Sequence, residues 1–175
     1  MSGTDSAGRA VQHGFRREIS APAIPVPAGA CDAHMHIVGP FGKYPLRETR
    51  SLSPPEATLE DYRQVRKTLG LQKNVVVQPS VFAKDNGCTL DAVEALGGTA
   101  RAIVVIDPDI AEGELASMHA RGARGVRVQR IVAGGASIND MEEIAARIQP
   151  FGWHLQFFLV AKDIADSNRL SCIAL

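Results

Sequence analysis

The sequence has no net charge, little cysteine and no long apolar run. Nineteen Lys and Arg residues balance nineteen Asp and Glu residues, so nothing predicts a nucleic-acid-binding protein, which usually carries a basic excess. No apolar stretch approaches the ~20 residues that a membrane-spanning helix needs. The three cysteines, Cys31, Cys88 and Cys172, lie far apart and form no C-x-x-C motif. They indicate neither a zinc knuckle nor a disulfide framework.

The first 28 residues are typical of a leader rather than of a folded domain. Prolines at 22, 25 and 27 favour an extended strap. Arg16 and Arg17 suit a twin-arginine export signal, but the segment that follows is too rich in proline for the apolar region of such a signal. We therefore expect a flexible leader over 1–28, a domain over 29–175 and a cytoplasmic protein.

From residue 30 onward, short apolar runs alternate with helical segments. We expect strands to begin near residues 30, 74, 101, 125 and 153, and helices over 58–69, 86–96, 112–121 and 138–148. This rhythm is typical of consecutive βα units in a parallel α/β sheet. An open doubly wound sheet and a (β/α)8 barrel both fit. A barrel of eight units needs ~250 residues, whereas five units are visible and residues 161–175 do not resemble further strands.

Two histidines at the end of the first expected strand are the clearest site candidates. His34 and His36 are two residues apart, so their side chains should share one face of the strand. Neighbouring imidazoles can bind one divalent ion or polarise a carbonyl, and active sites of parallel α/β folds gather at the carboxyl ends of strands. Asp32 has the same parity and is expected deeper on that face. The alternative is that the two rings are structural and form hydrogen bonds with loops.

An ordered set of motifs carries a resemblance to a known family. The motifs are CDAHMHIVGP at 31–40, YP at 44–45, VVQPS at 76–80, DN at 85–86, VIDPD at 105–109, GARGVR at 122–127 and GWHLQ at 152–156. Together they resemble the amidohydrolase superfamily, in its amidohydrolase-related branch, and most closely the 2-pyrone-4,6-dicarboxylate lactonase-like proteins. The resemblance implies a (β/α)8 TIM barrel that hydrolyses a lactone or a similar ester of a small carboxylic acid.

The same resemblance implies roles for individual residues. His34 and His36 are the expected catalytic residues, while Ser80 and Arg127 are expected to bind a small carboxylate or lactone substrate. An Arg–carboxylate pair is strong and directional. The alternatives are that Ser80 only turns the chain and that Arg127 forms a structural ion pair.

The two histidines also raise the expectation of a metal site. His34 and His36 could bind zinc, but a catalytic zinc usually has three protein ligands. The expected strand ends at 128–130 and 158–160 lack the further ligands of metal-using family members. No cofactor is therefore certain, and the sequence favours chemistry without metal.

The resemblance covers only about five of the eight βα units. The later histidine and the aspartate that activates water in this family have no match after residue 160. We expect a C-terminally truncated chain, incomplete or inactive by itself, whose open barrel edge allows self-association. The alternatives are a non-catalytic remnant and an open-sheet module that binds an anion at Gly134-Gly135. His154 is expected in the core and His119 at the surface.

Overall fold

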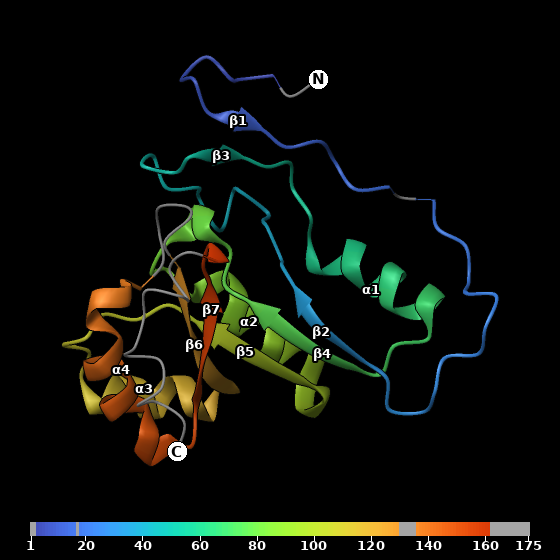
Figure 1. Cartoon of the computed structure of the whole chain (residues 1–175). Coiled ribbons are helices and arrows are strands. Elements are labelled where there is room, and N and C mark those ends of the chain that lie inside the picture. The colour runs from blue at the N-terminus through green and yellow to red at the C-terminus, as the bar shows by residue number, and fades with distance from the viewer. Residues whose placement is uncertain (1–2, 17, 130–135, 162–175) are drawn as a thin grey trace.

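The centre of the chain is a five-stranded parallel sheet (Figure 1). The computed structural model describes residues 3–16, 18–129 and 136–161. The strands are β2 (Cys31–Met35), β4 (Lys73–Val77), β5 (Ala100–Val104), β6 (Ala123–Gln129) and β7 (His154–Phe158). All five begin within one or two residues of the positions that the apolar runs predict.

Helices connect these strands. They are α1 (Leu59–Leu69), α2 (Gly87–Leu96), α3 (Glu112–Ala120) and α4 (Met141–Ile148). Short 3-10 turns lie at η1 (Ser80–Phe82), η2 (Gly97–Thr99), η3 (Ile138–Asp140) and η4 (Gln149–Phe151). Helix α1 shows how local sequence sets these bounds. Thr58 and Asp61 form a capping box at its start, and Gly70 ends it in the left-handed conformation.

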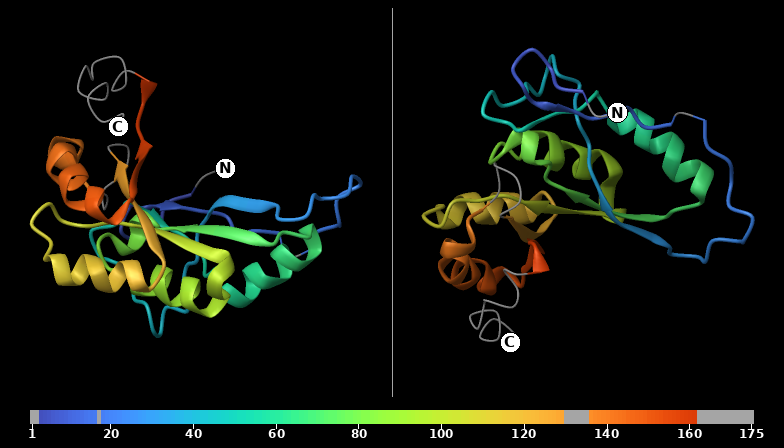
Figure 2. Two further views of the ribbon diagram at one scale, coloured as in Figure 1. Left: turned by 90° about the horizontal axis from the view of Figure 1, so that it is seen from below. Right: turned by 45° about the horizontal axis from the view of Figure 1, so that its top comes forward.

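The strand order excludes a doubly wound sheet. The order is β2-β4-β5-β6-β7, so each strand joins the sheet beside the strand that precedes it in the sequence. A doubly wound sheet needs a reversal of this order. Right-handed crossovers in one direction place all helices on one side, as the left panel of Figure 2 shows for α1, α2 and α3. The chain is therefore a curled half-barrel of (β/α)8 type, and the open-sheet alternative is wrong.

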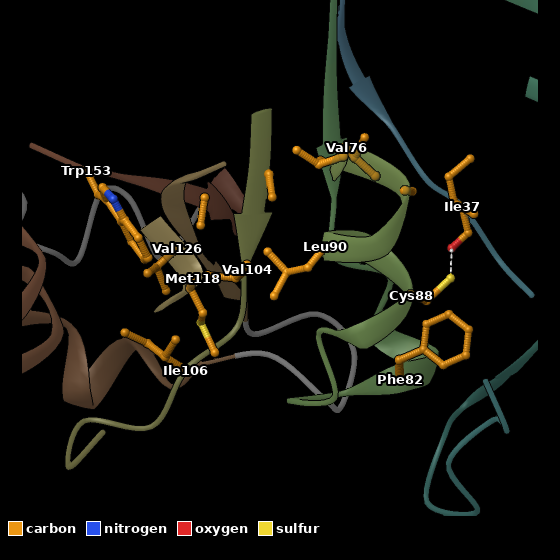
Figure 3. Packing of buried hydrophobic residues seen from close by; sticks show 14 of the residues in the cluster. Ile37, Val76, Phe82, Cys88, Leu90, Val104, Ile106, Met118, Val126 and Trp153 are labelled. Atoms are coloured by element: carbon orange, nitrogen blue, oxygen red, sulfur yellow. Dashed lines mark hydrogen bonds between the residues drawn. The ribbon is translucent and has the colours of Figure 1, made fainter. Parts of the chain in front are cut away.

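The main hydrophobic core lies between the strands and the helices. Val76, Val104 and Val126 point from three neighbouring strands and have no exposed surface. Figure 3 shows them beside Leu90 of α2 and Met118 of α3. This packing fixes which residues face the helices, and the residues between them face the inner, concave side of the sheet.

Irregular pairing at two places changes which side chains reach that inner face. The register shifts between Asp32 and Met35 of β2, and again where Ala102 and Ile103 of β5 pair with Ala123 and Gly125 of β6. Such a bulge reverses the face of every residue on one side of it. The positions of the polar residues at the inner face follow from these shifts.

A two-stranded parallel sheet joins the N-terminal segment to the long loop after β2. Strand β1 (Ala10–Val11) pairs with β3 (Leu52–Ser53), and Ser53 Oγ donates to Asp5 Oδ2 at 2.6 Å. The division of the chain into a flexible leader and a domain from residue 29 stays a prediction. Among the described residues, no helix is both long and apolar enough to cross a membrane.

Candidate active site

His34 and His36 lie side by side on the inner face of the half-barrel. Their ring centroids are 5.1 Å apart, and the ring planes are nearly perpendicular at 85°. Both residues remain exposed on the open side of the sheet. The two-residue spacing thus places both imidazoles together, as the strand period predicts.

A backbone carbonyl of the next strand fixes the orientation of His36. The Nδ1 atom of His36 lies 2.7 Å from the carbonyl oxygen of Val77 at the end of β4. A carbonyl can only accept a hydrogen bond, so Nδ1 carries the proton and Nε2 of the neutral ring keeps a free lone pair. Although solvent reaches the residue, desolvation by the surrounding protein lowers the pKa of His36 to about 4. His36 is therefore neutral near pH 7.

The electrostatics of His34 point the same way. Desolvation lowers the pKa of His34, and the positive charge of Arg127 lowers it further, while Asp32 acts in the opposite direction. The described residues form no hydrogen bond to the His34 ring, in contrast to that of His36. Its two nitrogen atoms are therefore available to a ligand.

Arg127 of β6 reaches the same inner face. Its side chain crosses the position of β5, and Nη1 donates to the carbonyl oxygen of Gln78, just after β4, at 3.3 Å. The guanidinium carbon lies 5.3 Å from the centroid of the Phe158 ring. Its neighbours Val126 and Val128 face the helices and are fully buried. Arg127 therefore points into the concavity that holds the two imidazoles.

Arg127 is a buried cation without an anionic partner among the described residues. It is only 7% exposed, and its Nε atom has no hydrogen-bond partner. Burial lowers the pKa of Arg127, but a guanidinium stays charged in a protein. A buried charge is normally paired, so the alternative of a structural ion pair lacks its acidic member in the described part of the chain. An anionic ligand would supply it.

Asp32 does not join the histidines, so the expectation from its parity is wrong. The bulge in β2 turns its side chain toward the helices, where Oδ2 accepts a hydrogen bond from Tyr62 at 3.1 Å. Asn74 donates to the same tyrosine oxygen from β4. Two imidazoles are fewer than the three protein ligands of a usual catalytic zinc, and the described residues contain no cluster of three metal-binding side chains. The residues in view therefore do not complete a zinc site.

Ser80 lies at the same edge of the sheet, and no hydrogen bond joins it to either histidine or to Arg127 among the described residues. It begins η1 after Pro79, is half-buried, and its backbone oxygen accepts from Ala83. The structure thus places Ser80 near the end of β4, and its role in binding substrate stays a prediction.

Two polar residues that sequence reasoning missed organise the loop that carries Ser80. The amide nitrogen of Gln78 donates to Ala83 and Asp85 at 3.0 and 2.8 Å, and its oxygen accepts from Thr89 at 2.5 Å. Asn86 exchanges two hydrogen bonds with the backbone of Val105. Both residues are buried. Gln78 directly follows the apolar run 75–77, and this is the one sequence feature that could have identified it; Asn86 has no such signal.

The remaining histidine expectations are reversed. His154 is exposed, because it lies at the inner face opposite Gly125, whereas a core position was expected. His119 is half-buried rather than solvated, and its Nδ1 accepts a hydrogen bond from Trp153 Nε1 at 2.9 Å. Gly134-Gly135, the proposed anion-binding turn, lies outside the described residues.

Comparisons with known proteins identify the family of this chain. Residues 31–170 match the family described as amidohydrolase. A 2-pyrone-4,6-dicarboxylate hydrolase of Comamonas testosteroni is 36% identical over 150 residues, which are 84% of this chain and 49% of that protein. A 4-sulfomuconolactone hydrolase of Hydrogenophaga intermedia is 40% identical over 114 residues, which are 65% of this chain and 38% of that protein.

The fold comparison gives the same result. An apo crystal structure from Agrobacterium tumefaciens superposes with a TM-score of 0.83 and 28% identity, over 91% of this chain and 57% of that chain. The chain spans about half the length of the curated relatives it matches. Because the family match includes most of the chain and the half-barrel agrees with a solved structure, this chain belongs to the amidohydrolase family.

Proposed function

We propose that this chain supplies the carboxylate-binding part of an active site that hydrolyses a lactone or a similar ester of a small carboxylic acid. The observation that carries the proposal is the buried guanidinium of Arg127, which has no anionic partner among the described residues and shares the inner face with two exposed imidazoles. The names of two relatives, a pyrone dicarboxylate hydrolase and a sulfomuconolactone hydrolase, support an anionic cyclic ester as the substrate class.

Arg127 holds the carboxylate of the substrate in this proposal. A guanidinium presents two parallel N–H donors that match a carboxylate, which fixes orientation as well as affinity. The low exposure of Arg127 strengthens the interaction, because water competes weakly for a buried charge. The ester group of the bound ligand then extends toward His34 and His36.

The proton position on His36 assigns it the role of proton acceptor. With Nδ1 bonded to Val77, the free Nε2 atom of the neutral ring accepts a proton or a hydrogen bond and cannot donate one to a carbonyl. His34 is not fixed in this way and is the better candidate to donate to the ester carbonyl. The spacing alone indicated that both rings polarise the carbonyl. In this proposal only His34 does so.

Binding and turnover are separable in this chain. By the family resemblance, the aspartate that activates water comes from a later part of the barrel and has no match after residue 160. We therefore expect the 175-residue chain to bind a lactone carboxylate without hydrolysing it. Hydrolysis by the isolated chain at a rate that disappears in a His36→Ala variant would contradict this expectation.

Side-chain NMR tests the binding site directly. Addition of 5-oxotetrahydrofuran-2-carboxylate, a five-membered lactone with one carboxylate, should shift the imidazole nitrogen signals of His34 and His36 and the guanidinium signal of Arg127. The surface histidine His13 is the internal control and should not shift. If the signals of His34, His36 and Arg127 stay unchanged at millimolar ligand, the proposed site is wrong.

We also propose self-association through the free edge of β7. Among the described residues β7 pairs only with β6, and Phe157, Phe158 and Val160 are 36%, 42% and 49% exposed. An apolar strand edge of this kind readily pairs with another chain. Sedimentation velocity should show association that grows with concentration and weakens in Val160→Lys, but not in Ile24→Lys in the leader. A monomer at every concentration contradicts the proposal.

Location in the cytoplasm and the absence of a nucleic-acid partner stay predictions.

A further inference from the structure

A buried glutamine two residues after Arg127 has no hydrogen-bond partner for its side chain. Gln129 is 5% exposed, and neither its amide nitrogen nor its amide oxygen is bonded to any described residue. Its backbone N–H is satisfied by the carbonyl of Ala136 at 3.2 Å. Unpaired buried amides destabilise a fold and are rare in native proteins, so the position calls for an explanation beyond packing.

Strand parity places this amide in the same concavity as Arg127. Val126 and Val128 face the helices, so Arg127 and Gln129 share the inner face of β6. Gln129 is the register partner of Phe158, whose ring lies 5.3 Å from the guanidinium carbon of Arg127. The aromatic ring therefore lies beside the guanidinium, and Gln129 occupies the paired position of β6 on the same face.

The neighbouring strand, β7, also contributes a buried amide oxygen without a hydrogen-bond partner among the described residues. Gln156 of β7 is the register partner of Arg127, and its buried Oε1 atom also lacks a hydrogen bond among the described residues. Arg127 and Gln129 are two residues apart on β6, so both side chains start from the same face of the sheet.

We propose that Gln129 is a further substrate-binding residue, whose amide hydrogen-bonds an uncharged oxygen of the ligand that Arg127 holds by its carboxylate. This inference rests on the proposed function and names its substrate class more narrowly, as a small cyclic ester bearing a carboxylate across the ring from the contacted oxygen. A neutral amide offers one acceptor and two donors, so it suits an ester oxygen or a hydroxyl better than a second carboxylate.

A matched ligand pair tests the role of Gln129. The ligands are 5-oxotetrahydrofuran-2-carboxylate and cyclopentanecarboxylate, which have the same ring size and charge and differ in the two ester oxygens. Calorimetric titration of the full chain should show a preference for the lactone. In Gln129→Leu the ratio of the two dissociation constants should fall by about tenfold, the value of one hydrogen bond, while the affinity for cyclopentanecarboxylate stays nearly constant. Gln64→Leu, at an exposed position of α1, is the control and should not change the ratio.

Stability separates ligand recognition from a structural role. Because the wild-type amide is unpaired, Gln129→Leu should unfold at the same or a higher urea concentration. A structural hydrogen bond would give a lower midpoint. If the leucine variant does not fold, Gln129→Met, with a side chain of similar length, replaces it, and a strong loss of stability in both variants overturns the proposal.

The Arg127→Met variant separates a failure of the role of Gln129 from a failure of the proposed function. It should weaken binding of both ligands. If it weakens both while Gln129→Leu leaves their ratio unchanged, the inference about Gln129 is wrong and the proposed function stands. If Arg127→Met changes neither affinity, or if the wild-type chain binds neither ligand, the proposed function fails and the role of Gln129 fails with it.

Discussion

Replacement of Arg127 by methionine should strongly weaken carboxylate binding and leave the fold almost as stable. Among the described residues the guanidinium makes one hydrogen bond, of 3.3 Å, to the backbone carbonyl of Gln78, and its Nε atom has no partner. Loss of one such bond costs about 1 kcal/mol. Removal of a buried cation without an acidic partner offsets that cost, because the desolvation penalty of the charge disappears. We expect the free energy of unfolding to change by less than about 1.5 kcal/mol.

The expected effect on binding is much larger. A hydrogen bond between charged groups contributes roughly 1.5–3 kcal/mol, and a carboxylate accepts two of them from one guanidinium. Loss of both amounts to about 3 kcal/mol or more, which is a weakening of the dissociation constant by at least about 100-fold. The charge of Arg127 also lowers the pKa of His34 and His36, so both imidazoles should titrate at a higher pH in the variant.

Three measurements on the full chain check this reasoning. Urea unfolding gives the stability, calorimetry with 5-oxotetrahydrofuran-2-carboxylate gives the affinity, and NMR titration gives the two histidine pKa values. Arg63→Met is the matched control, because Arg63 is an exposed arginine of α1 paired with Glu60. A loss of 3 kcal/mol or more in stability would mean that the guanidinium has a buried ionic partner. That result, or an unchanged affinity, would refute the assignment of Arg127 as a substrate-binding residue.

Three further substitutions or conditions test the local physics. Desolvation lowers the pKa of His36 from 6.5 to about 4, so the unfolded chain binds more protons than the folded chain between these pH values. Urea unfolding should therefore show a free energy of unfolding that falls as the pH falls, by at most about 1.4 kcal/mol per pH unit and by less because solvent reaches the ring. His36→Gln should flatten this part of the pH profile, and a profile equal to that of the wild type contradicts the pKa shift. Gly125→Ala should lose about 1–3 kcal/mol of stability, because the added Cβ would lie 2.8 Å from the carbonyl oxygen of His154, whereas Gly113→Ala in α3 meets no atom within 4 Å and should be neutral or stabilising. Thr58→Ala removes the capping box of α1 and should lower the unfolding free energy by about 1 kcal/mol; an unchanged urea midpoint would show that the cap contributes nothing.

The regular elements of this fold are predictable because their signals are local. Five apolar runs give the five strands, and Thr58 and Gly70 mark the ends of α1 as capping rules require. Strand order is not a local property, and it separates a half-barrel from a doubly wound sheet. The motif resemblance, rather than periodicity, identified the barrel. The pairing of β1 with β3 had no signal at all, because two-residue strands have no periodicity.

The site shows the same division between local and non-local information. The period of a strand predicts that His34 and His36 are neighbours, and their rings are 5.1 Å apart. It also predicts Asp32 deeper on the same face, and this is wrong because a bulge between Asp32 and Met35 reverses the face. A bulge has no residue signature in this segment. As a consequence, the carboxylate of Asp32 accepts hydrogen bonds from the backbone of His34 and from Tyr62 rather than from an imidazole ring, and the charge of Arg127 has no acidic partner among the described residues.

The orientation of the polar side chains in the site depends on backbone carbonyls that no sequence motif could identify. The carbonyl of Val77 fixes the proton of His36 on Nδ1, and the carbonyl of the next residue, Gln78, accepts from Arg127. Every residue has a carbonyl, so only the curl of the sheet determines that these two, at the end of β4, face the ligand side. The end of β4 thus lies between the proposed proton acceptor and the proposed carboxylate anchor and sets their relative orientation. The side chain of Gln78 in turn holds the loop after η1, so the same residue couples the anchor to the loop that carries Ser80.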